Sequence, residues 1–229
     1  MSTTRDASDG YKPLVGLGIV TYRSLLTLQP LVERIIGLYA AMPPIWVADD
    51  GSRDGTTEYL RALRIGQSYP HVGVAHNRNR VLDHLFARSC SVVVTLDDDA
   101  EITEDDWLDH WTAAAIQFGV VCFDGSRSSA VPVRDGCVSA HGFGITRGAY
   151  EILGGFDERY DAGWGFEDED LARRWRRGGF STGSLSYGIA GGGTGRFGDD
   201  EDFAFNRRLY ESFADGQIKV ERRLHRDES

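Results

Sequence analysis

Three adjacent carboxylates at residues 97–99 directly follow the apolar, β-branched run of residues 92–96. Like charges this close repel one another by about 1 kcal/mol per pair in water and by about 4 kcal/mol at a protein surface, so the arrangement calls for a compensating partner. Side chains alternate along an extended chain, so Asp97 and Asp99 can face one side while Asp98 points elsewhere. Two oxygen ligands on one side suit Mg²⁺ or Mn²⁺. The alternative is a solvated acidic turn before a helix.

A second acidic pair, Asp49 and Asp50, ends the apolar stretch that begins at residue 43. Strand-length and helix-length segments alternate over the first 125 residues, which predicts an α/β fold with a mostly parallel sheet and helices on both faces. Ligands bind beyond the carboxyl ends of such strands. The first, second and fourth predicted strands all end in polar clusters, at 21–23, 49–52 and 97–99, so we expect these clusters to meet at one rim.

A third acidic group, residues 167–170, opens the predicted helix of EDEDLARRWRRGG. The third and fourth acids of this group have arginines four residues on, whereas Glu167 and Asp168 have a leucine and an alanine there. A carboxylate with no local partner, close to Trp164, is a candidate general base. The alternative is that all four acids only complement the helix dipole.

The apolar periodicity predicts the elements that must position these groups. Strands are expected at 13–22, 43–49, 71–76, 90–99 and 120–123, and helices at 28–42, 56–65, 80–89 and 103–118, the last capped by Thr103. Beyond residue 125 the chain looks α+β and rich in loops: a strand and a short helix are expected within 137–160, a helix that begins near 167 and stops at a glycine, a glycine-dense loop at 188–200, and a final helix at 201–214.

The composition bounds the class of protein. Hydrophobic residues make up 41% and charged residues 26% of the 229 residues, and no apolar run is long enough to cross a bilayer, so no transmembrane segment is expected. The net charge of −10 argues against general nucleic-acid binding. The first residues lack an apolar signal core, and the three cysteines form no CxxC pair, which favours a cytoplasmic protein.

Several other motifs carry less chemistry. GTGRFG at 193–198 is followed at once by acids and by no further βαβ unit, so phosphate binding is disfavoured there. SRDGT at 52–56 has a serine where an aspartyl phosphatase needs its nucleophile. The histidines show no ligand spacing, and only His141, in the small-residue strand SAHGFG, is a candidate of interest.

Four ordered motifs together resemble those of the family 2 type of nucleotide-sugar glycosyltransferases, which have the GT-A fold. VGLGIVTYRS is similar to their first strand, IWVADDGSRDGT to their DDGS segment and VVVTLDDDAEI to their DXD strand. GGFDERYDAGWGFEDEDLARRWRRGG is similar to the acceptor-side motif of galactosyltransferase-like members. The resemblance spans roughly residues 14–179.

The resemblance implies a GT-A (Rossmann-like) fold and a role for each matching position. The polar residues 1–12 are expected to be flexible, and the length of the chain predicts one domain, at 13–229. The resemblance divides this domain into a nucleotide-sugar-binding half (13–125), an acceptor and catalytic half (126–198) and a C-terminal helical tail (199–229). It assigns Asp168 as the catalytic base; Glu167 and Trp164 to acceptor binding; Thr21, Tyr22, Arg23, Asp49, Asp50, Arg80 and Asp98 to the nucleotide sugar, with Arg78 as an alternative to Arg80; and Asp97 and Asp99 to Mn²⁺ or Mg²⁺.

The implied reaction is inverting transfer of a hexose or N-acetylhexosamine from a nucleotide sugar, with UDP favoured, to an acceptor hydroxyl. The acceptor stays open between a glycan, a lipid-linked sugar, a protein side chain, a small metabolite and modified nucleic acid. Many relatives have a metal-binding histidine downstream of the Glu-Asp motif, but this chain has none between Asp168 and Val220, so Asp199, Asp200 or water would complete the site. The alternative function is an inactive sugar-nucleotide or glycan-binding protein on the same fold.

Overall fold

The protein is described here by a computed structural model, which covers residues 13–124, 131–133, 139–191, 200–213 and 218–220. The expected flexible start at 1–12, the GTGRFG motif and Asp199 lie outside these residues. Within them, no helix is both long and apolar enough to cross a bilayer.

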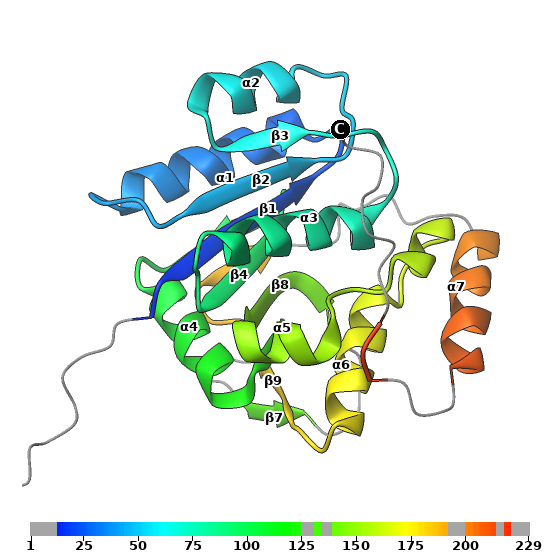
Figure 1. Ribbon diagram of the computed structural model, residues 1–229. Helices are drawn as coiled ribbons and strands as arrows, with labels where there is room; N and C mark the ends of the chain where they lie inside the picture. The colour runs from blue at the N-terminus through cyan, green and yellow to red at the C-terminus, as the bar shows by residue number, and fades with distance from the viewer. Residues whose placement is uncertain (1–12, 125–130, 134–138, 192–199, 214–217, 221–229) are drawn as a thin grey trace, which may run out of the picture.

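An eight-stranded, mostly parallel sheet forms the centre of the molecule (Figure 1). In sheet order its strands are β3 (Gly66–Ser68), β2 (Ile45–Asp49), β1 (Val15–Thr21), β4 (Val92–Asp97), β8 (Ser139–Thr146), β6 (Val120–Phe123), β9 (Thr182–Leu185) and β7 (Val131–Val133). The first four are parallel to one another, whereas β8 runs antiparallel to both β4 and β6. A small second sheet pairs β5 (Ala100–Ile102) with β10 (Ile189–Gly191).

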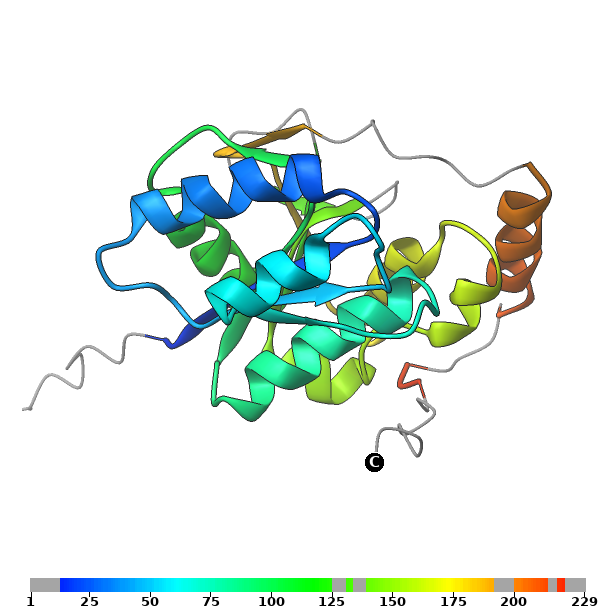
Figure 2. The ribbon, with the colours of Figure 1, turned by 90° about the horizontal axis from the view of Figure 1, so that it is seen from above.

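Helices cover both faces of the sheet, as Figure 2 shows from above. One face packs against α1 (Leu25–Leu38), α2 (Thr56–Leu63) and α4 (Trp107–Phe118). The other packs against α3 (Val74–Ala87), α5 (Arg147–Leu153) and α6 (Glu167–Arg177). The short helix η1 (Glu158–Ala162) leads towards α6, and α7 (Asp200–Ser212) stands beside η1. The expected α/β GT-A architecture is therefore confirmed.

The alternation of β1 explains how one strand serves two cores. Leu17 and Ile19 point into the core under α1 and α4, while the alternate positions are Gly16, Gly18 and Val20, and Val20 belongs to the core on the other face. A Cβ atom on Gly18 would lie only 2.1 Å from a Val81 methyl group of α3. Glycine at this position therefore lets α3 pack directly on the strand, which places the start of α3 close to the carboxyl rim of the sheet.

Two local predictions were wrong. Residues 71–76, expected as the third strand, are irregular chain at 71–73 and the first residues of α3, and the third strand is instead the short β3. The apolar residues of HVGVAH are too few to separate a strand from a helix start by periodicity. Thr103 does not cap α4, because that helix begins at Trp107 with Asp106 at the N-cap position.

Candidate active site

The polar clusters at the ends of β1, β2 and β4 meet at one rim, as their pattern predicted. In the parallel register, Thr21 lies opposite Asp49 and Val20 opposite Asp97. The backbone N–H of Tyr22 donates a hydrogen bond to a carboxylate oxygen of Asp98 across 3.3 Å. The residues after β1 and β4 are therefore in direct contact, since both strands end at the same edge of the sheet.

Asp97, Asp99 and His141 form the candidate metal centre. Each offers one ligand atom, and these three atoms lie within 4.8 Å of one another. His141 Nδ1 is 3.3 Å from an Asp99 oxygen and 3.8 Å from an Asp97 oxygen. The imidazole comes from β8, which runs antiparallel beside β4, so the sheet itself brings the histidine to the two acids.

The electrostatics of this cluster favour a cation. Burial of the His141 ring lowers its pKa, but the hydrogen bonds and charges of Asp97 and Asp99 outweigh that effect and raise the pKa to about 9. Proton and metal therefore compete for the same nitrogen. Two carboxylates and one imidazole fit a divalent ion such as Mn²⁺, because carboxylate oxygens suit Mg²⁺ and Mn²⁺ while imidazole favours transition metals.

Asp98 is not part of the metal cluster, but β4 ends at Asp97, and Asp98 and Asp99 form the turn that follows instead of the strand that the sequence predicts. Burial raises the pKa of Asp98 to about 6, and the negative charges of Asp97 and Asp99 add to the shift. The bond from the Tyr22 N–H opposes this effect. Asp98 thus fixes the chain immediately after β1, where the resemblance places the nucleotide.

Arg78 of α3 connects the end of β4 to the start of α6. Its buried guanidinium lies 2.7 Å from an Asp97 oxygen and 3.3 Å from a Glu167 oxygen. Glu167 therefore does have an ionic partner, contrary to the expectation from helical spacing, because the partner comes from another helix. The same bridge holds the first residue of α6 next to the end of β4.

Glu167 and Asp168 open α6 at the edge of the site. Asp168 accepts hydrogen bonds from the backbone N–H groups of Ala140 (3.0 Å) and Glu169 (2.8 Å), so one bond ties it to β8 directly beside His141. Burial raises the pKa of both acids, and their mutual repulsion adds to the effect on Glu167. A raised pKa beside a metal cluster is the environment expected of a general base.

The loop of residues 71–73, which precedes α3, is bound to Asp50 at the end of β2. Asp50 is almost fully buried and accepts hydrogen bonds from His71 Nδ1 (2.7 Å) and from the backbone N–H groups of Val72 and Gly73 (both 3.0 Å). The imidazole of His71 stacks on Tyr22, with ring centroids 4.4 Å apart and planes 9° apart. Asp50 therefore organises this loop, and its contact with a base stays a prediction.

The other residues that are expected to bind the nucleotide sugar lie around this loop. Asp49 accepts bonds from the backbone N–H and the hydroxyl of Ser52, and that hydroxyl also accepts a bond from the Arg23 N–H. Arg23 has a left-handed backbone, with φ of 54°, and its guanidinium lies 4.8 Å from the Tyr22 ring centroid. Arg80 stacks over the Tyr69 ring and lies 3.7 Å from Asp50, on the buried side of the loop.

Trp164 lies in the loop that leads into α6, against the C-terminal helix. Its ring centroid is 5.7 Å from that of Phe203 on α7. Its backbone N–H donates to the Asp202 carbonyl across 3.4 Å. The predicted acceptor residue is thus held against α7.

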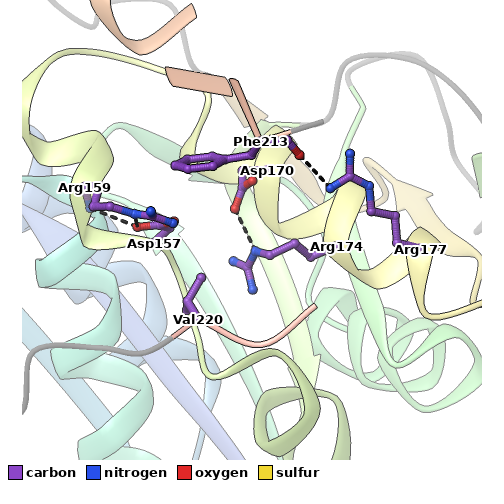
Figure 3. Close-up of a pocket in the computed structure, with 7 residues that line it drawn as sticks. All are labelled: Asp157, Arg159, Asp170, Arg174, Arg177, Phe213 and Val220. Carbon is purple, nitrogen blue, oxygen red and sulfur yellow. Dashed lines mark hydrogen bonds and ion pairs between the residues drawn. The ribbon is translucent and has the colours of Figure 1, made fainter. Parts of the chain in front are cut away.

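A separate small cavity of about 40 Å³ lies away from this rim (Figure 3). It is lined by residues of η1, α6 and the segments after α7: Asp157, Arg159, Asp170, Arg174, Arg177, Phe213 and Val220. Its arginines bond to protein acceptors; Arg174, for example, binds Asp170 at 2.7 Å and the Leu153 and Gly155 carbonyls. The cavity is therefore a structural junction and not part of the candidate active site.

Sequence reasoning missed two site residues and left a third undecided. No pattern in the sequence assigns a role to His71, although only α2 and β3 separate it from Asp50 in the chain. His141 was noted, but not as a neighbour of the DXD acids, because antiparallel pairing of β8 with β4 is not visible in the sequence. Arg78 was placed near a phosphate or base, whereas in this structure it bridges two carboxylates.

Comparison with known proteins decides the family. A sequence model of "Glycosyl transferase family 2" matches residues 17–171. The chain belongs to this family. The match begins in β1 and ends within α6, so it includes the metal cluster, Arg78 and Asp168. No curated protein matches this glycosyltransferase-family chain in a sequence comparison.

Solved structures of glycosyltransferases share the fold. The mannosyltransferase PcManGT from Pyrobaculum calidifontis, solved with GDP-Man and Mn²⁺, superposes with a TM-score of 0.62 at 18% identity, covering 90% of this chain and 66% of that chain. S. aureus TarS residues 1–349, solved with UDP, give a TM-score of 0.58 at 16% identity, covering 89% of this chain and 67% of that chain. This family 2 chain thus spans about two thirds of each of these two chains, and 40% of the longer solved chain of S. aureus TarS.

Proposed function

We propose that the chain is a metal-dependent, inverting glycosyltransferase that moves a hexose or N-acetylhexosamine from a nucleotide sugar, with UDP favoured, to an acceptor hydroxyl. One observation carries the proposal. Asp97, Asp99 and His141 form a three-ligand cluster, and Ala140, the residue next to His141 in β8, donates its backbone N–H to Asp168. A metal cluster and a candidate base side by side are what this transfer requires.

The nucleotide would lie along the rim between the ends of β1 and β2. The stacked Tyr22 and His71 rings offer an aromatic surface for the base, with His71 oriented by Asp50. The Thr21 side chain is buried at the end of β1, where it interacts with Asp98 and opposes the rise in the pKa of that carboxyl.

Asp97, Asp99 and His141 would hold the divalent cation, either Mn²⁺ or Mg²⁺. A bound cation would neutralise the charge that develops on the departing diphosphate. Arg78 contributes permanent positive charge beside Asp97, which steadies that carboxylate while its other oxygen faces the cluster.

Asp168 would take the proton from the acceptor hydroxyl. Its two backbone hydrogen bonds fix the carboxylate, and its raised pKa keeps it basic enough to accept a proton as the new bond forms. Attack from the side opposite the leaving diphosphate gives inversion. Glu167 would hold the acceptor, because one of its buried carboxylate oxygens has no hydrogen-bond partner among the described residues.

Two similar structures contain different nucleotides, GDP-Man in one and UDP in the other, so the donor must be tested directly. We expect a thermal-shift screen of UDP-, GDP- and dTDP-sugars, with and without Mn²⁺, to find one donor that stabilises the protein only with the metal. A cytoplasmic location, expected from the cysteines, belongs to the same proposal.

The alternative function, an inactive nucleotide-sugar or glycan-binding protein, is separated from the enzyme by Asp168. We expect Asp168→Asn to lower transfer by roughly 10²- to 10⁴-fold while the donor-induced thermal shift persists. Glu169→Gln is the matched control, since only the backbone of Glu169 contacts the base. If wild-type protein binds the donor but produces no more glycoside than Asp168→Asn with any acceptor class, the binding protein is the better account.

A further inference from the structure

The start of α3 is capped by a residue that is distant in the sequence. Gly73 occupies the N-cap position of α3 and has no side chain to offer. Asp161, in η1, accepts hydrogen bonds from the backbone N–H groups of Ala75 (2.8 Å) and His76 (2.9 Å), the second and third residues of the helix. These are the N–H groups that an N-cap side chain usually satisfies. Asp161 therefore caps α3 from a segment that follows His76 by 85 residues.

Both carboxylate oxygens of Asp161 are used in this contact. Oδ1 accepts from Ala75 and Oδ2 from His76, so two bonds fix the orientation of the carboxylate. Gly73 leaves the necessary space, because a Cβ atom there would lie 2.3 Å from Oδ1, and its φ of +134° favours glycine. An amide in the same orientation would present an oxygen to only one of the two N–H groups. The contact therefore depends on a carboxylate at position 161.

Two further contacts bind η1 and the residues before it along α3. Glu158 Oε1 accepts a hydrogen bond from Asn79 Nδ2 (2.8 Å), and its Oε2 lies 3.4 Å from His76 Nδ1. The Asn79 amide also exchanges two hydrogen bonds with the backbone of Phe156, at 2.8 and 2.9 Å. Residues 156–161 are therefore held along the first two turns of α3.

The segment that follows η1 carries the proposed base. Residues 163–166 alone separate η1 from α6. Glu167, the first residue of α6, pairs with Arg78 of α3 at 3.3 Å, and Asp168 accepts a hydrogen bond from the Ala140 N–H. Helix α3 thus contacts both ends of this short segment, since Asp161 binds it at the start and Arg78 binds it at the end.

We propose that Asp161 is a positioning residue for the proposed base, Asp168. By capping α3 from η1, it sets the place at which α6 begins, and therefore the place of Asp168 beside the metal cluster. Asp161 acts through the backbone of the residues that follow it. Asn206 of α7 binds the Tyr160 and Gly165 carbonyls and so supports the shape of the segment, whereas Asp161 links the segment to α3. The inference rests on the proposed glycosyltransferase function.

The first test is amide hydrogen exchange of the full chain, measured by NMR, with the Ala140 N–H as the reporter. This N–H donates to Asp168, so its protection depends on the place of the base. We expect Asp161→Ala to speed exchange at Ala140 at least about tenfold, although Ala140 lies on β8 and Asp161 on η1. Asp161→Asn, which keeps one acceptor oxygen, should give a smaller increase. Amides within β1 should exchange as in the wild type, which excludes general unfolding.

Asp157→Asn is the matched control for this measurement. Asp157 is buried and caps η1 itself, because it accepts a hydrogen bond from the Arg159 N–H at 3.0 Å. Its carboxylate pairs with the Arg159 side chain in the separate small cavity (Figure 3). The variant therefore makes the same chemical change at the same short helix but removes a contact within η1. Exchange at Ala140 should stay within about twofold of wild type.

A kinetic measurement tests the inference through the reaction. The probes are UDP-glucose, UDP-N-acetylglucosamine and GDP-mannose with Mn²⁺, and water is the acceptor. The bond from the anomeric carbon to the diphosphate breaks, water forms the new carbon–oxygen bond, and its proton passes to Asp168. We expect Asp161→Ala to lower kcat roughly tenfold or more and to leave KM for the donor within about threefold, because a displaced base slows the chemical step without changing donor contacts. Asp157→Asn should change neither constant by more than about twofold.

Three results would overturn the inference. Exchange at Ala140 in Asp161→Ala stays within twofold of wild type, Asp157→Asn speeds this exchange equally, or KM for the donor rises as much as kcat falls. Failure of the proposed function has a different signature: the wild type releases no nucleotide with any acceptor class. The exchange measurement needs no turnover, so it still decides whether Asp161 places Asp168.

Discussion

Glu167, the first residue of α6, forms an ion pair with Arg78 of α3 at 3.3 Å, although the two residues are 89 positions apart. The same guanidinium also meets Asp97 at 2.7 Å, and it is 4% exposed. The buried guanidinium of Arg78 is thus shared by Asp97, on the proposed metal side, and Glu167, on the proposed acceptor side. The two halves of the site are held at a fixed separation by this bridge.

Removal of this buried charge should destabilise the fold. Arg78→Met leaves the buried Glu167 and the partly exposed Asp97 without their guanidinium partner, and we expect a loss of about 3 kcal/mol in the free energy of unfolding, measured by urea denaturation. Arg61→Met, which changes an exposed arginine of α2, should stay within about 0.5 kcal/mol. A loss below about 1 kcal/mol for the Arg78 variant would mean that the bridge contributes little.

Metal affinity should depend on pH through His141. Its pKa is raised to about 9, so below that pH the ring carries a proton that must leave before Nδ1 can bind a cation. Calorimetric titration with MnCl₂ and UDP should therefore show an affinity that rises with pH between 6 and 8, by up to roughly tenfold per unit. His141→Gln should bind Mn²⁺ at least about tenfold more weakly, with a flatter pH profile. Equal slopes for the variant and the wild type would contradict a ligand role for His141.

The stacked Tyr22 and His71 rings should contribute to nucleotide affinity. We expect His71→Ala to raise the dissociation constant for UDP by roughly three- to tenfold, with Mg²⁺ present, because the aromatic surface loses one ring. His110→Ala is a matched control. His110 lies on α4, its ring centroid is 4.1 Å from that of Tyr187, and its side chain is about as exposed as that of His71. A base that contacts neither ring would leave UDP binding unchanged in the His71 variant.

The parts of the site that sequence predicted are those encoded in a continuous stretch. Asp97 and Asp99 follow a β-branched run, so a pair of acids on one side can be anticipated from spacing, although β4 ends at Asp97 and it is the turn after it that directs Asp98 towards Tyr22. The rim itself followed from the parallel order of the first strands, since their polar ends must lie at one edge.

The parts that sequence could not predict depend on pairing between distant segments. His141 reaches the acids because β8 pairs antiparallel with β4, and Arg78 reaches Glu167 because α3 packs beside α6 on one face of the sheet. Neither arrangement leaves a local pattern. Helical spacing predicts ion pairs only between residues of the same helix, so it cannot predict that Glu167 has a partner on α3.

On the proposed mechanism, Asp97, Asp99 and His141 coordinate a divalent cation, and this cation binds the diphosphate of the nucleotide sugar. Anomalous diffraction from crystals grown with UDP and MnCl₂ tests it most directly. We predict a manganese peak about 2.1 Å from Asp99 and His141, with diphosphate oxygens completing its shell. A manganese peak elsewhere, or UDP bound at the rim with no metal between its phosphates and these residues, would contradict the claim.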